Sequence, residues 1–344
     1  MVRLPASQRN RPGAGHQGPP TETDRQSAER MKQRPPALPV DTRLDRYRIT
    51  QVLGGGGFSI VYLAADTETA QPVIIKEYIP SRLAGRREDL SVVPKTEDDA
   101  GRFSRGRQLF FQEASALATL KHPNIVNVLN FFRANGTVYM VMEYQEGKNL
   151  QAYLTARRGN LSETFLRTVF PPLLDGLALI HSRDLLHLDI KPGNIHIQPG
   201  GQPLLLDFGA VHGFPQSRQS QPGQIISPGF SPIEQYDVNG YVGPWTDIYA
   251  LGATMRACIE GRPPPPARER HERDTLKSAR SAFRKRYSDG LLQAIDWAME
   301  IDPLLRPQAV ADFVLALDAE PPEVAPEAPS TLGWLVGNLP WGKG

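Results

Sequence analysis

The sequence contains one cysteine, Cys258, which excludes an internal disulfide and a metal site built from several thiolates. Cys258 lies within the apolar run Tyr249–Ile259, so we expect a buried structural thiol. No apolar run reaches the roughly 18 residues that a membrane span needs. The net charge of only +2 argues against a nucleic acid or another polyanion as a general partner. Residues 1–5 lack the apolar core of a signal peptide, so the cytoplasm is the expected location.

The two terminal segments differ in composition from the rest of the chain. Residues 1–42 contain seven prolines, and their Lys and Arg exceed Asp and Glu by 7 − 4 = 3. Such a segment cannot bury enough apolar surface to offset its ordering entropy, so we predict a disordered basic leader, with a binding role as the alternative. Residues 319–344 form a Pro-rich linker and a tail that contains Trp334 and Trp341. The tail is expected to dock on the domain, on a partner or on a membrane surface, and its sequence does not distinguish these three alternatives.

Residues 43–144 show the alternation and the turn residues of an antiparallel sheet. Five strands are predicted, at Tyr47–Leu53, Ser59–Ala65, Pro72–Tyr78, Ile125–Phe132 and Thr137–Glu143. Arg102–Leu120 has apolar residues at helical spacing and predicts one amphipathic helix.

After Gly147 the pattern becomes helical, which places a lobe boundary close to residue 144. Five helices are predicted, at Leu150–Arg158, Glu163–Arg183, Trp245–Glu260, Asp289–Glu300 and Gln308–Asp318. Residues 43–318 are therefore expected to form one α+β domain with two lobes. The small lobe (43–144) would hold a five-stranded antiparallel sheet and one helix, and the large lobe (145–318) would be mainly helical.

Four side chains near the middle of the sequence suit phosphoryl transfer. Asp189 can accept a proton, Lys191 can neutralise phosphate charge, and Asn194 can hold a metal ion through its oxygen. Asp207, on a short turn further along, is a second candidate metal ligand. Together these are the groups needed to move a phosphoryl group from ATP to a hydroxyl.

A glycine-rich turn, Gly54–Gly57, joins the first two predicted strands and can present backbone N–H groups to phosphates. Hairpins also use glycine for purely steric reasons, so the turn alone does not establish a phosphate-binding site. Lys76 ends an apolar strand and could pair with the α- and β-phosphates, whereas an ordinary lysine there would be solvated. Glu113 lies close to the buried stripe of the predicted helix, where an unpaired charge is costly. We therefore predict an ion pair between Lys76 and Glu113.

With these motifs in order, residues 43–318 resemble a bacterial eukaryotic-like (Hanks-type) serine/threonine protein kinase. Ser227–Glu234 is similar to the end of the activation segment of that family, and Asp247 to an aspartate of its central large-lobe helix. Arg306 resembles the arginine that pairs with Glu234 in such kinases. Ser227 resembles a hydroxyl that contacts the catalytic aspartate.

The resemblance implies a bilobal protein-kinase fold, ATP with Mg²⁺ or Mn²⁺, and protein hydroxyls as the phosphate acceptors. The implied catalytic residues are Asp189, Lys191, Lys76 and Glu113, and the implied metal ligands are Asn194 and Asp207. The implied nucleotide-binding residues are Leu53, Gly54, Gly55, Gly56, Gly57, Phe58, Ser59, Val61, Ile74, Lys76, Met142, Glu143, Gln145 and His196. In that set Met142 resembles the gatekeeper, and the backbones of Glu143 and Gln145 are implied to bond the adenine.

Four residues depart from the family pattern. Leu188 stands where most such kinases have an arginine that binds a phosphate on the activation loop. Because leucine cannot do this, we predict activity without loop phosphorylation, although Ser217, Ser220 and Ser227 offer hydroxyls. Ser59 replaces a loop glycine, which is tolerated if its φ is negative. Ile74 and His196 are expected to narrow or polarise the nucleotide pocket. For His196, a neutral, packed imidazole is favoured over a pH sensor or a contact with the base of the nucleotide.

Two alternatives remain. A pseudokinase that binds nucleotide or acts as a scaffold is favoured by the departures and disfavoured because every catalytic residue is present. A small-molecule phosphotransferase of the aminoglycoside type is disfavoured because such enzymes usually lack the Gly229–Glu234 segment and Arg306. Finally, Glu77–Gly101 resembles an insertion of a bacterial subfamily whose members include kinases linked to type VI secretion and stress signalling, which suggests a bacterial source.

Overall fold

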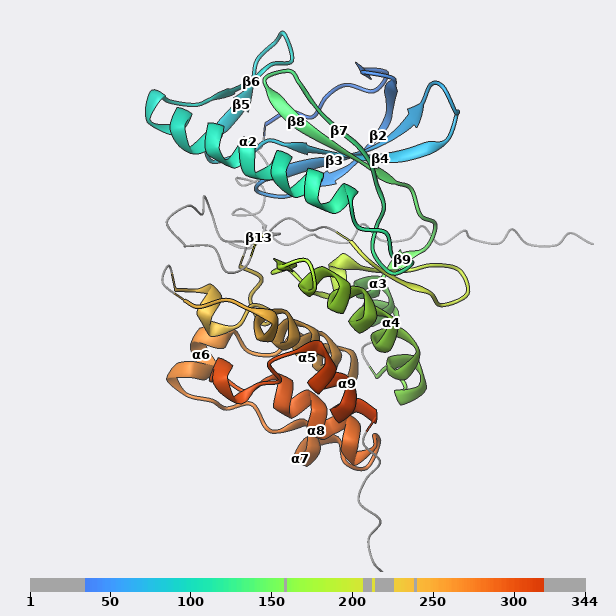
Figure 1. The fold of residues 1–344 in the computed structure, drawn as a ribbon, viewed down its shortest axis with the longest axis vertical. Coiled ribbons are helices and arrows are strands. Elements are labelled where there is room, and N and C mark those ends of the chain that lie inside the picture. Colours follow the sequence, from blue (N-terminus) through green and yellow to red (C-terminus); the bar gives the residue numbers. More distant parts are fainter. Residues whose placement is uncertain (1–34, 158–159, 207–211, 214–225, 238–239, 319–344) are drawn as a thin grey trace, which may run out of the picture.

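The computed structural model describes residues 35–318, apart from 158–159, 207–211, 214–225 and 238–239. Two lobes are visible in Figure 1, with a sheet and one long helix above and a group of helices below. Most of the predicted leader, the tail from residue 319, and Asp207, Ser217 and Ser220 lie outside the described residues.

The small lobe contains a six-stranded antiparallel sheet, so the prediction of five strands was wrong by one. In spatial order the strands are β1 (Arg43–Leu44), β2 (Tyr47–Gly55), β3 (Ser59–Asp66), β4 (Pro72–Tyr78), β8 (Thr137–Glu143) and β7 (Val128–Ala134). The additional strand β1 has only two residues and therefore no alternation to recognise. The predicted strand from Ile125 begins instead at Val128, because Ile125 bridges to Leu205 of the large lobe.

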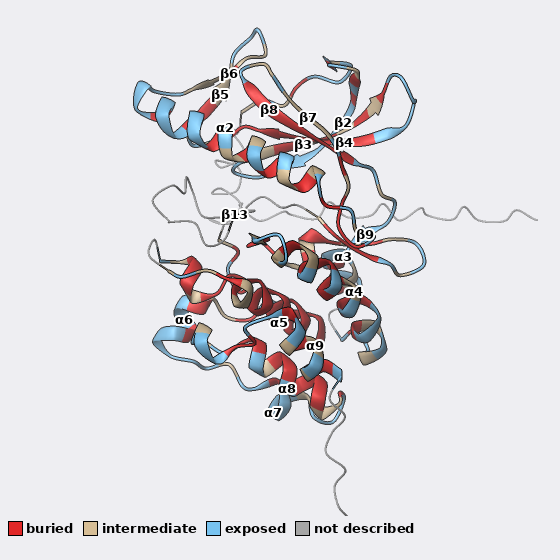
Figure 2. Ribbon diagram, viewed as in Figure 1, coloured by how far each residue is buried: buried red, intermediate tan, exposed pale blue. Residues whose placement is uncertain are grey.

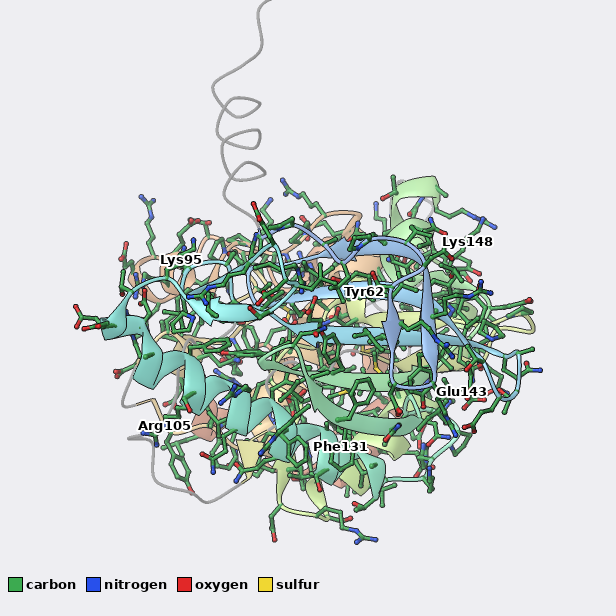
Figure 3. The ribbon with its side chains drawn as sticks, turned by 90° about the horizontal axis from the view of Figure 1, so that it is seen from above. Tyr62, Lys95, Arg105, Phe131, Glu143 and Lys148 are labelled. Atoms are coloured by element: carbon green, nitrogen blue, oxygen red, sulfur yellow. The ribbon has the colours of Figure 1, made fainter. Side chains whose placement is uncertain are left out.

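Helix α2 (Glu97–Ala118) packs against β7 and β8 and lies along one side of the sheet in Figure 3. It begins five residues earlier than predicted. The Thr96 side chain caps it by accepting the N–H of Asp99, and three acidic residues in the first turn favour the positive end of the helix dipole. Its buried stripe includes Phe103, Phe110 and Leu117.

The segment that resembles an insertion forms a hairpin of β5 (Ala84–Arg86) and β6 (Val92–Pro94). Part of the predicted leader packs beside it. Leu38 is only 1% exposed, its N–H donates to the Tyr62 hydroxyl (3.1 Å), and Arg86 Nε donates to Pro36 O (2.8 Å). The chain therefore joins the small lobe by residue 36 rather than at 43, because Leu38 is an isolated apolar anchor among prolines.

In the large lobe, the five predicted helices are present with ends shifted by a few residues. The α-helices are α3 (Leu150–Arg157), α4 (Glu163–His181), α5 (Pro244–Glu260), α6 (Ala267–Glu272), α7 (Ala279–Phe283), α8 (Asp289–Ala298) and α9 (Val310–Asp318). Helices α6 and α7 were not predicted, since five or six residues hold too little periodicity. Short 3₁₀ turns are η1 (Pro192–Asn194), η2 (Ile233–Gln235) and η3 (Pro303–Leu305).

Short strands of the large lobe position the loops that face the sheet. They are β9 (Lys148–Asn149), β11 (Ile195–Ile197) and β12 (Pro203–Leu205) in one sheet, and β10 (Leu185–Leu186) with β13 (His212–Gly213) in another. Helix α5 is buried along almost its whole length, as its red colour in Figure 2 shows. The Cys258 thiol on α5 is buried as predicted, and burial raises its pKa. Among the described helices, none has the length and apolar character to cross a membrane.

Candidate active site

A cavity of about 340 Å³ lies between the lobes. Eight of the predicted nucleotide-binding residues line it, namely Leu53, Val61, Ile74, Lys76, Met142, Glu143, Gln145 and His196. The lining also includes Val126, Tyr144, Gly147, Gly193, Asn194 and Leu206, which were not predicted to contact nucleotide. Of these, Asn194 was predicted as a metal ligand, whereas the two glycines, Val126 and Leu206 carry no functional group that a sequence pattern reveals.

The glycine-rich turn between β2 and β3 lies beside this cavity without lining it, since none of residues 54–59 (all described) contributes to the wall. Its backbone is anchored to the segment after β4. The carbonyl of Phe58 accepts the N–H of Ile79 (2.9 Å), and the carbonyl of Gly57 accepts the N–H of Ser81 (2.8 Å). Ser59 is not among the positive-φ residues, so serine is tolerated there. The phosphate contacts of this turn remain a prediction.

Lys76 and Glu113 come from facing elements, β4 and α2. Both are buried, with exposed fractions of 5% and 8%. Lys76 Nζ lies 5.9 Å from the ring centroid of Phe110, which precedes Glu113 by one helical turn and shares its face. The two predicted partners therefore occupy neighbouring positions beneath the sheet, and the ion pair between them stays a prediction.

The residues predicted for proton and phosphate chemistry converge on the Asp189 carboxylate. Lys191 Nζ donates to both carboxylate oxygens (2.9 and 2.8 Å), and the Ser227 hydroxyl donates to Oδ1 (2.7 Å). Asn194 Nδ2 donates to Asp189 Oδ2 (2.9 Å) and to its main-chain carbonyl (2.8 Å). Lys191 Nζ also reaches the Ser227 hydroxyl (3.0 Å). The expected contact between Ser227 and the aspartate is confirmed, although the two lie 38 residues apart.

The orientation of Asn194 suits a hard cation. Its amide nitrogen is held by Asp189, so the amide oxygen is the atom left to act as a ligand, and the side chain lines the nucleotide cavity. Amide and carboxylate oxygens are the ligands that Mg²⁺ and Mn²⁺ prefer. The donor set therefore fits the implied metal, whose second predicted ligand, Asp207, lies outside the described residues.

Asp247 at the start of α5 fixes the backbone that leads into the catalytic loop. Its carboxylate accepts the N–H groups of His187 (2.8 Å) and Leu188 (2.7 Å) and lies 2.9 Å from His181 Nε2. Leu188 needs this support, because its φ of 59° is costly for a branched residue. Burial of Asp247 opposes ionisation, but the hydrogen bond and charge of His181 and the contacts with His187 outweigh it and lower the pKa.

The side chain of Leu188 is packed rather than extended into solvent. It is buried in a small apolar cluster with Leu186 and with the partly buried Val242. Its carbonyl accepts the side-chain amide of Gln235 (2.8 Å). The position that would hold a phosphate-binding arginine thus contributes apolar contacts and no charge.

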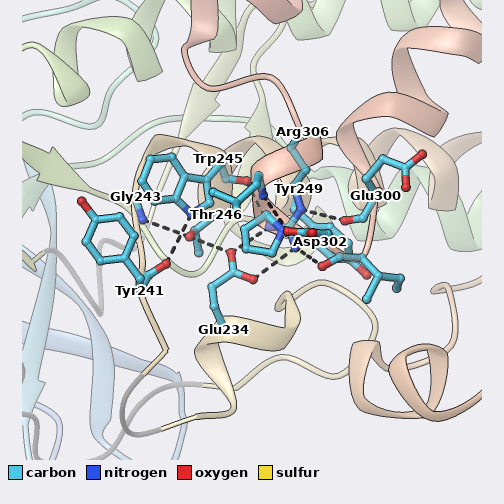
Figure 4. Close-up of polar contacts among 12 residues, drawn as sticks. Glu234, Tyr241, Gly243, Trp245, Thr246, Tyr249, Glu300, Asp302 and Arg306 are labelled. Atoms are coloured by element: carbon cyan, nitrogen blue, oxygen red, sulfur yellow. Dashed lines mark hydrogen bonds and ion pairs between the residues drawn. The ribbon is translucent and has the colours of Figure 1, made fainter.

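The predicted pair of Glu234 and Arg306 is present in the large lobe (Figure 4). Arg306 Nη1 lies 2.7 Å from Glu234 Oε1 and Nη2 lies 3.1 Å from Oε2, with both side chains buried. Thr246 donates to the same carboxylate (2.9 Å), and the guanidinium lies 4.7 Å from the ring centroid of Tyr249. The pair connects η2 to the turn before α9 and so anchors the segment that carries Ser227.

Comparison with known proteins identifies the fold. A profile of the protein kinase domain family matches residues 47–314. The chain belongs to the protein kinase family. The relatives of its kinase domain are serine/threonine kinases, so the domain is of that type. The chain therefore does not belong to the family of small-molecule phosphotransferases.

Curated relatives come from both eukaryotes and bacteria. The kinase domain is 31% identical to serine/threonine-protein kinase STE20 of Candida glabrata over 268 residues, which cover 77% of this chain and 27% of the relative. It is 32% identical to serine/threonine-protein kinase PknA of Nostoc sp. over 229 residues (64% and 38%) and 29% identical to serine/threonine-protein kinase PrkC of Bacillus subtilis over 219 residues (64% and 31%). The chain thus spans less than half the length of these relatives.

A solved structure of PpkA-294 in its apo form is similar to the kinase domain. The two share 36% sequence identity and a TM-score of 0.71, and the match covers 82% of this chain and 99% of that one.

The kinase domain also has a buried polar network that the sequence pattern did not reveal. Glu77 follows Lys76 and is fully buried on the sheet. Its carboxylate accepts hydrogen bonds from Tyr62 and Tyr139 (2.7 Å each) and pairs with Arg86 of the hairpin (2.5 Å). Burial and the nearby Glu77 charge raise the pKa of both tyrosines. Glu77 and Arg86 stood out only as part of an insertion, because the two tyrosines that complete the network lie 15 and 62 residues from Glu77.

His196 lines the cavity between the lobes of the kinase domain, and its contact with a nucleotide stays a prediction. Its Nε2 atom is buried and has no hydrogen-bond partner among the described residues. It lies against Gly147, where an added Cβ would be 2.7 Å from Nε2 and 2.2 Å from Ile197 O. Gly147 also has a φ of 139°, so only glycine fits this position.

Proposed function

We propose that this chain is an active serine/threonine protein kinase, which transfers the γ-phosphate of ATP to hydroxyl groups of proteins. The observation that carries the proposal is the set of hydrogen bonds that Lys191, Asn194 and Ser227 donate to the Asp189 carboxylate. This cluster lies beside the nucleotide cavity. Asn194 belongs both to this cluster and to the cavity wall, so the base and the nucleotide would share one site.

Each residue would have a defined task in the transfer. The acceptor oxygen forms a bond to the γ-phosphorus, the bond from that phosphorus to the bridging oxygen of ADP breaks, and the acceptor proton goes to Asp189. Lys191 would offset the negative charge that spreads over the transferred group, and Lys76 would hold the other phosphates. The contact of Ser227 with Asp189 would keep the carboxylate oriented until the acceptor arrives.

Asn194 and Asp207 would hold a divalent cation, Mg²⁺ or Mn²⁺. When bound, such an ion neutralises phosphate charge and orients the phosphates. The support from this chain is Asn194 in the cavity wall, whose amide nitrogen is bound by Asp189, so that its oxygen is the atom suited to a cation. Removal of divalent cations with EDTA should abolish transfer and leave the folded state intact, which circular dichroism would check.

We also propose that catalysis does not require a phosphate on the activation loop. Leu188 carries no charge and is buried against Leu186, while Asp247 and Gln235 bind its backbone. The catalytic loop is therefore anchored by groups that are always present. Phosphatase treatment should leave the rate unchanged; abolition of activity by phosphatase, restored by a phosphomimetic at Ser217 or Ser220, would contradict this.

The pseudokinase alternative is separated from an active kinase by measuring binding and transfer on the same preparation. Nucleotide affinity is followed by titration calorimetry with a non-hydrolysable ATP analogue, and transfer is followed with ATP labelled on the γ-phosphate and a mixed protein acceptor. We expect both binding and transfer, with the label on phosphoserine or phosphothreonine. Binding without transfer would support the pseudokinase, and label on tyrosine would contradict the proposed class.

The similarity to PpkA-294 and the hairpin that carries Arg86 support a place in the bacterial subfamily that includes kinases linked to type VI secretion. Deletion of the gene in its host, followed by comparison of phosphopeptides and of secretion, would test this. If phosphopeptides were lost but secretion were unchanged, the result would support the kinase activity and contradict a role in secretion.

A further inference from the structure

One part of the large lobe is far more basic than the rest of the chain. Between residues 262 and 286, Lys and Arg exceed Asp and Glu by 9 − 3 = 6, whereas the whole chain has an excess of only 2. This segment includes α6 and α7, and most of α7 and the loop before it are exposed in Figure 2. None of its residues belongs to the catalytic cluster or the nucleotide cavity.

Many of these cations are available to a ligand. Arg273, Lys277, Arg284 and Lys285 are exposed, and none of them forms an ion pair with a described side chain. Two nearby glutamates, Glu269 and Glu272, are also exposed and form no ion pair with a described side chain, whereas three other carboxylates are already engaged. Glu260 binds Arg256 and Arg262, Asp274 binds Arg270, and Asp289 binds Arg280. The four exposed cations outnumber the two exposed glutamates, so the surface presents an excess of positive charge.

A groove opens within this basic surface. Its volume is about 770 Å³, and its apolar lining includes Pro264, Leu276, Ala282 and Phe283. Its charged lining consists of Arg256, Arg262 and Lys277 with Glu260 and Glu269, and Glu260 is paired with the two arginines. Arg256 orders the wall, because its guanidinium lies 4.9 Å from the Phe283 ring centroid and donates to the carbonyl of Lys277 (3.0 Å). The groove is thus a structured apolar site with a cationic rim, suited to an acidic segment that also carries large apolar side chains.

Residues 319–344 of this chain have that composition. Their first part carries Glu320, Glu323 and Glu327, and no Lys or Arg occurs before Lys343. Their second part carries Trp334 and Trp341 with several leucines and a valine. The glutamates of the first part are complementary to a cationic surface, and the tryptophans of the second part are complementary to an apolar groove within it.

The described chain also ends beside the basic surface. Arg167 donates to the carbonyl of Leu317 (3.0 Å), near the end of α9, and to the hydroxyl of Ser288 (3.1 Å), two residues beyond Arg286. Helix α9 packs on α8, and α8 packs on α7, as their adjacent positions in Figure 1 show. From Asp318 to Trp334 there are 334 − 318 = 16 residues, which extend to roughly 50 Å.

We propose that the acidic, tryptophan-containing segment 319–344 docks on its own large lobe. The glutamates lie against the basic surface formed by Lys277, Arg284 and Lys285, and a tryptophan occupies the groove beside Phe283. Docking within one chain is favoured over capture of a separate acidic protein, because the linker keeps the tail at a high local concentration.

Fluorine NMR of the full chain labelled with 5-fluorotryptophan tests this. The signals of Trp334 and Trp341 are assigned by replacing each with phenylalanine. In the wild type we expect at least one of them away from the position it takes in urea. The variant K277Q/R284Q/K285Q should move that signal to the urea position, and E320Q/E323Q/E327Q should do the same. The matched control R82Q/R87Q/R105Q removes three exposed arginines of the small lobe and should leave the signal in place.

Three outcomes would overturn the proposal. Wild-type tail signals at the urea position would show that the tail is not docked. An equal effect of the control variant would show that the large-lobe surface is not the site. A signal that returns to the urea position on dilution would assign the docking to a second copy of the chain. None of these readouts depends on kinase activity, so the proposed function is tested separately.

Discussion

Arg306 and Glu234 form a bidentate ion pair across 72 residues of sequence, with N–O distances of 2.7 and 3.1 Å and neither side chain more than 4% exposed. Removal of one partner leaves the other charge buried without compensation, which is far more costly than removal of both. We expect Arg306→Leu to lower the free energy of unfolding by about 3–5 kcal/mol.

Urea unfolding followed by circular dichroism would measure this loss. Glu68→Gln is the control, since Glu68 and Arg46 form an ion pair of similar length (2.8 Å) on the exposed surface. The control should be indistinguishable from the wild type, because exposed pairs are screened by water. Equal losses in the two variants would show that the buried pair has no special structural role.

Asp247 predicts a particular pH dependence of stability. Because its pKa is lowered in the folded state, its ionised form stabilises the protein above the unfolded pKa of about 3.9, and this contribution is lost as the pH falls through the folded pKa. We expect Asp247→Asn to cost about 3 kcal/mol at pH 7, since one amide oxygen cannot replace a carboxylate that accepts two backbone N–H groups.

The measurement is urea unfolding of both proteins from pH 7 to pH 3. The gap between the wild type and Asp247→Asn should be constant above pH 5 and should narrow below pH about 4. A gap that stays constant throughout would mean that Asp247 has an ordinary pKa.

The Glu77 network predicts a link between the hairpin and the nucleotide site. Arg86→Leu leaves the buried Glu77 carboxylate without its cation and should destabilise the domain by about 3–5 kcal/mol. Because Glu77 is adjacent to Lys76 on β4, we also expect a higher KM for ATP. Arg87→Gln is the neighbouring control, an exposed arginine outside the described ion pairs. Loss of stability with an unchanged KM would limit the network to a structural role.

Ser227 predicts a loss in kcat without a change in nucleotide binding. Its hydroxyl orients Asp189 Oδ1, and the residue is absent from the lining of the nucleotide cavity. Ser227→Ala should lower kcat about tenfold, which is less than the 10²–10⁴ that a catalytic base itself contributes. Ser227→Thr keeps the hydroxyl and should retain most activity. Steady-state kinetics would decide, and an increased KM for ATP with normal kcat would contradict the assigned role.

Elements with strong local patterns could be predicted from the sequence. Pro72–Tyr78 and Thr137–Glu143 match β4 and β8 at both ends, because alternation and turn residues bound them clearly. The sixth strand was missed because Arg43–Leu44 is defined by its partner β2 and not by its own residues. Leu38 was assigned to the leader for the same reason, since its burial depends on Tyr62.

The site shows the same division between motif chemistry and long-range contacts. The clustering of Asp189, Lys191 and Asn194 follows from their spacing in one loop, so the sequence was sufficient. Two other features of the site depend on contacts between residues that are about 60 apart in sequence. Asp247 binds the backbone of the catalytic loop, and Tyr139 binds Glu77, which no sequence motif marked. Such contacts are decided by how the helices and strands pack, which a single sequence does not display.

The most direct test of the central claim is the initial rate of γ-phosphate transfer by the full chain and by Asp189→Asn, measured with labelled ATP and a mixed protein acceptor. Asparagine keeps the size of the side chain but cannot take the acceptor proton. We predict measurable transfer by the wild type and a rate at least about 10²-fold lower for Asp189→Asn, with unchanged affinity for a non-hydrolysable ATP analogue. Equal transfer by the two proteins would contradict the assignment of Asp189 as the catalytic base.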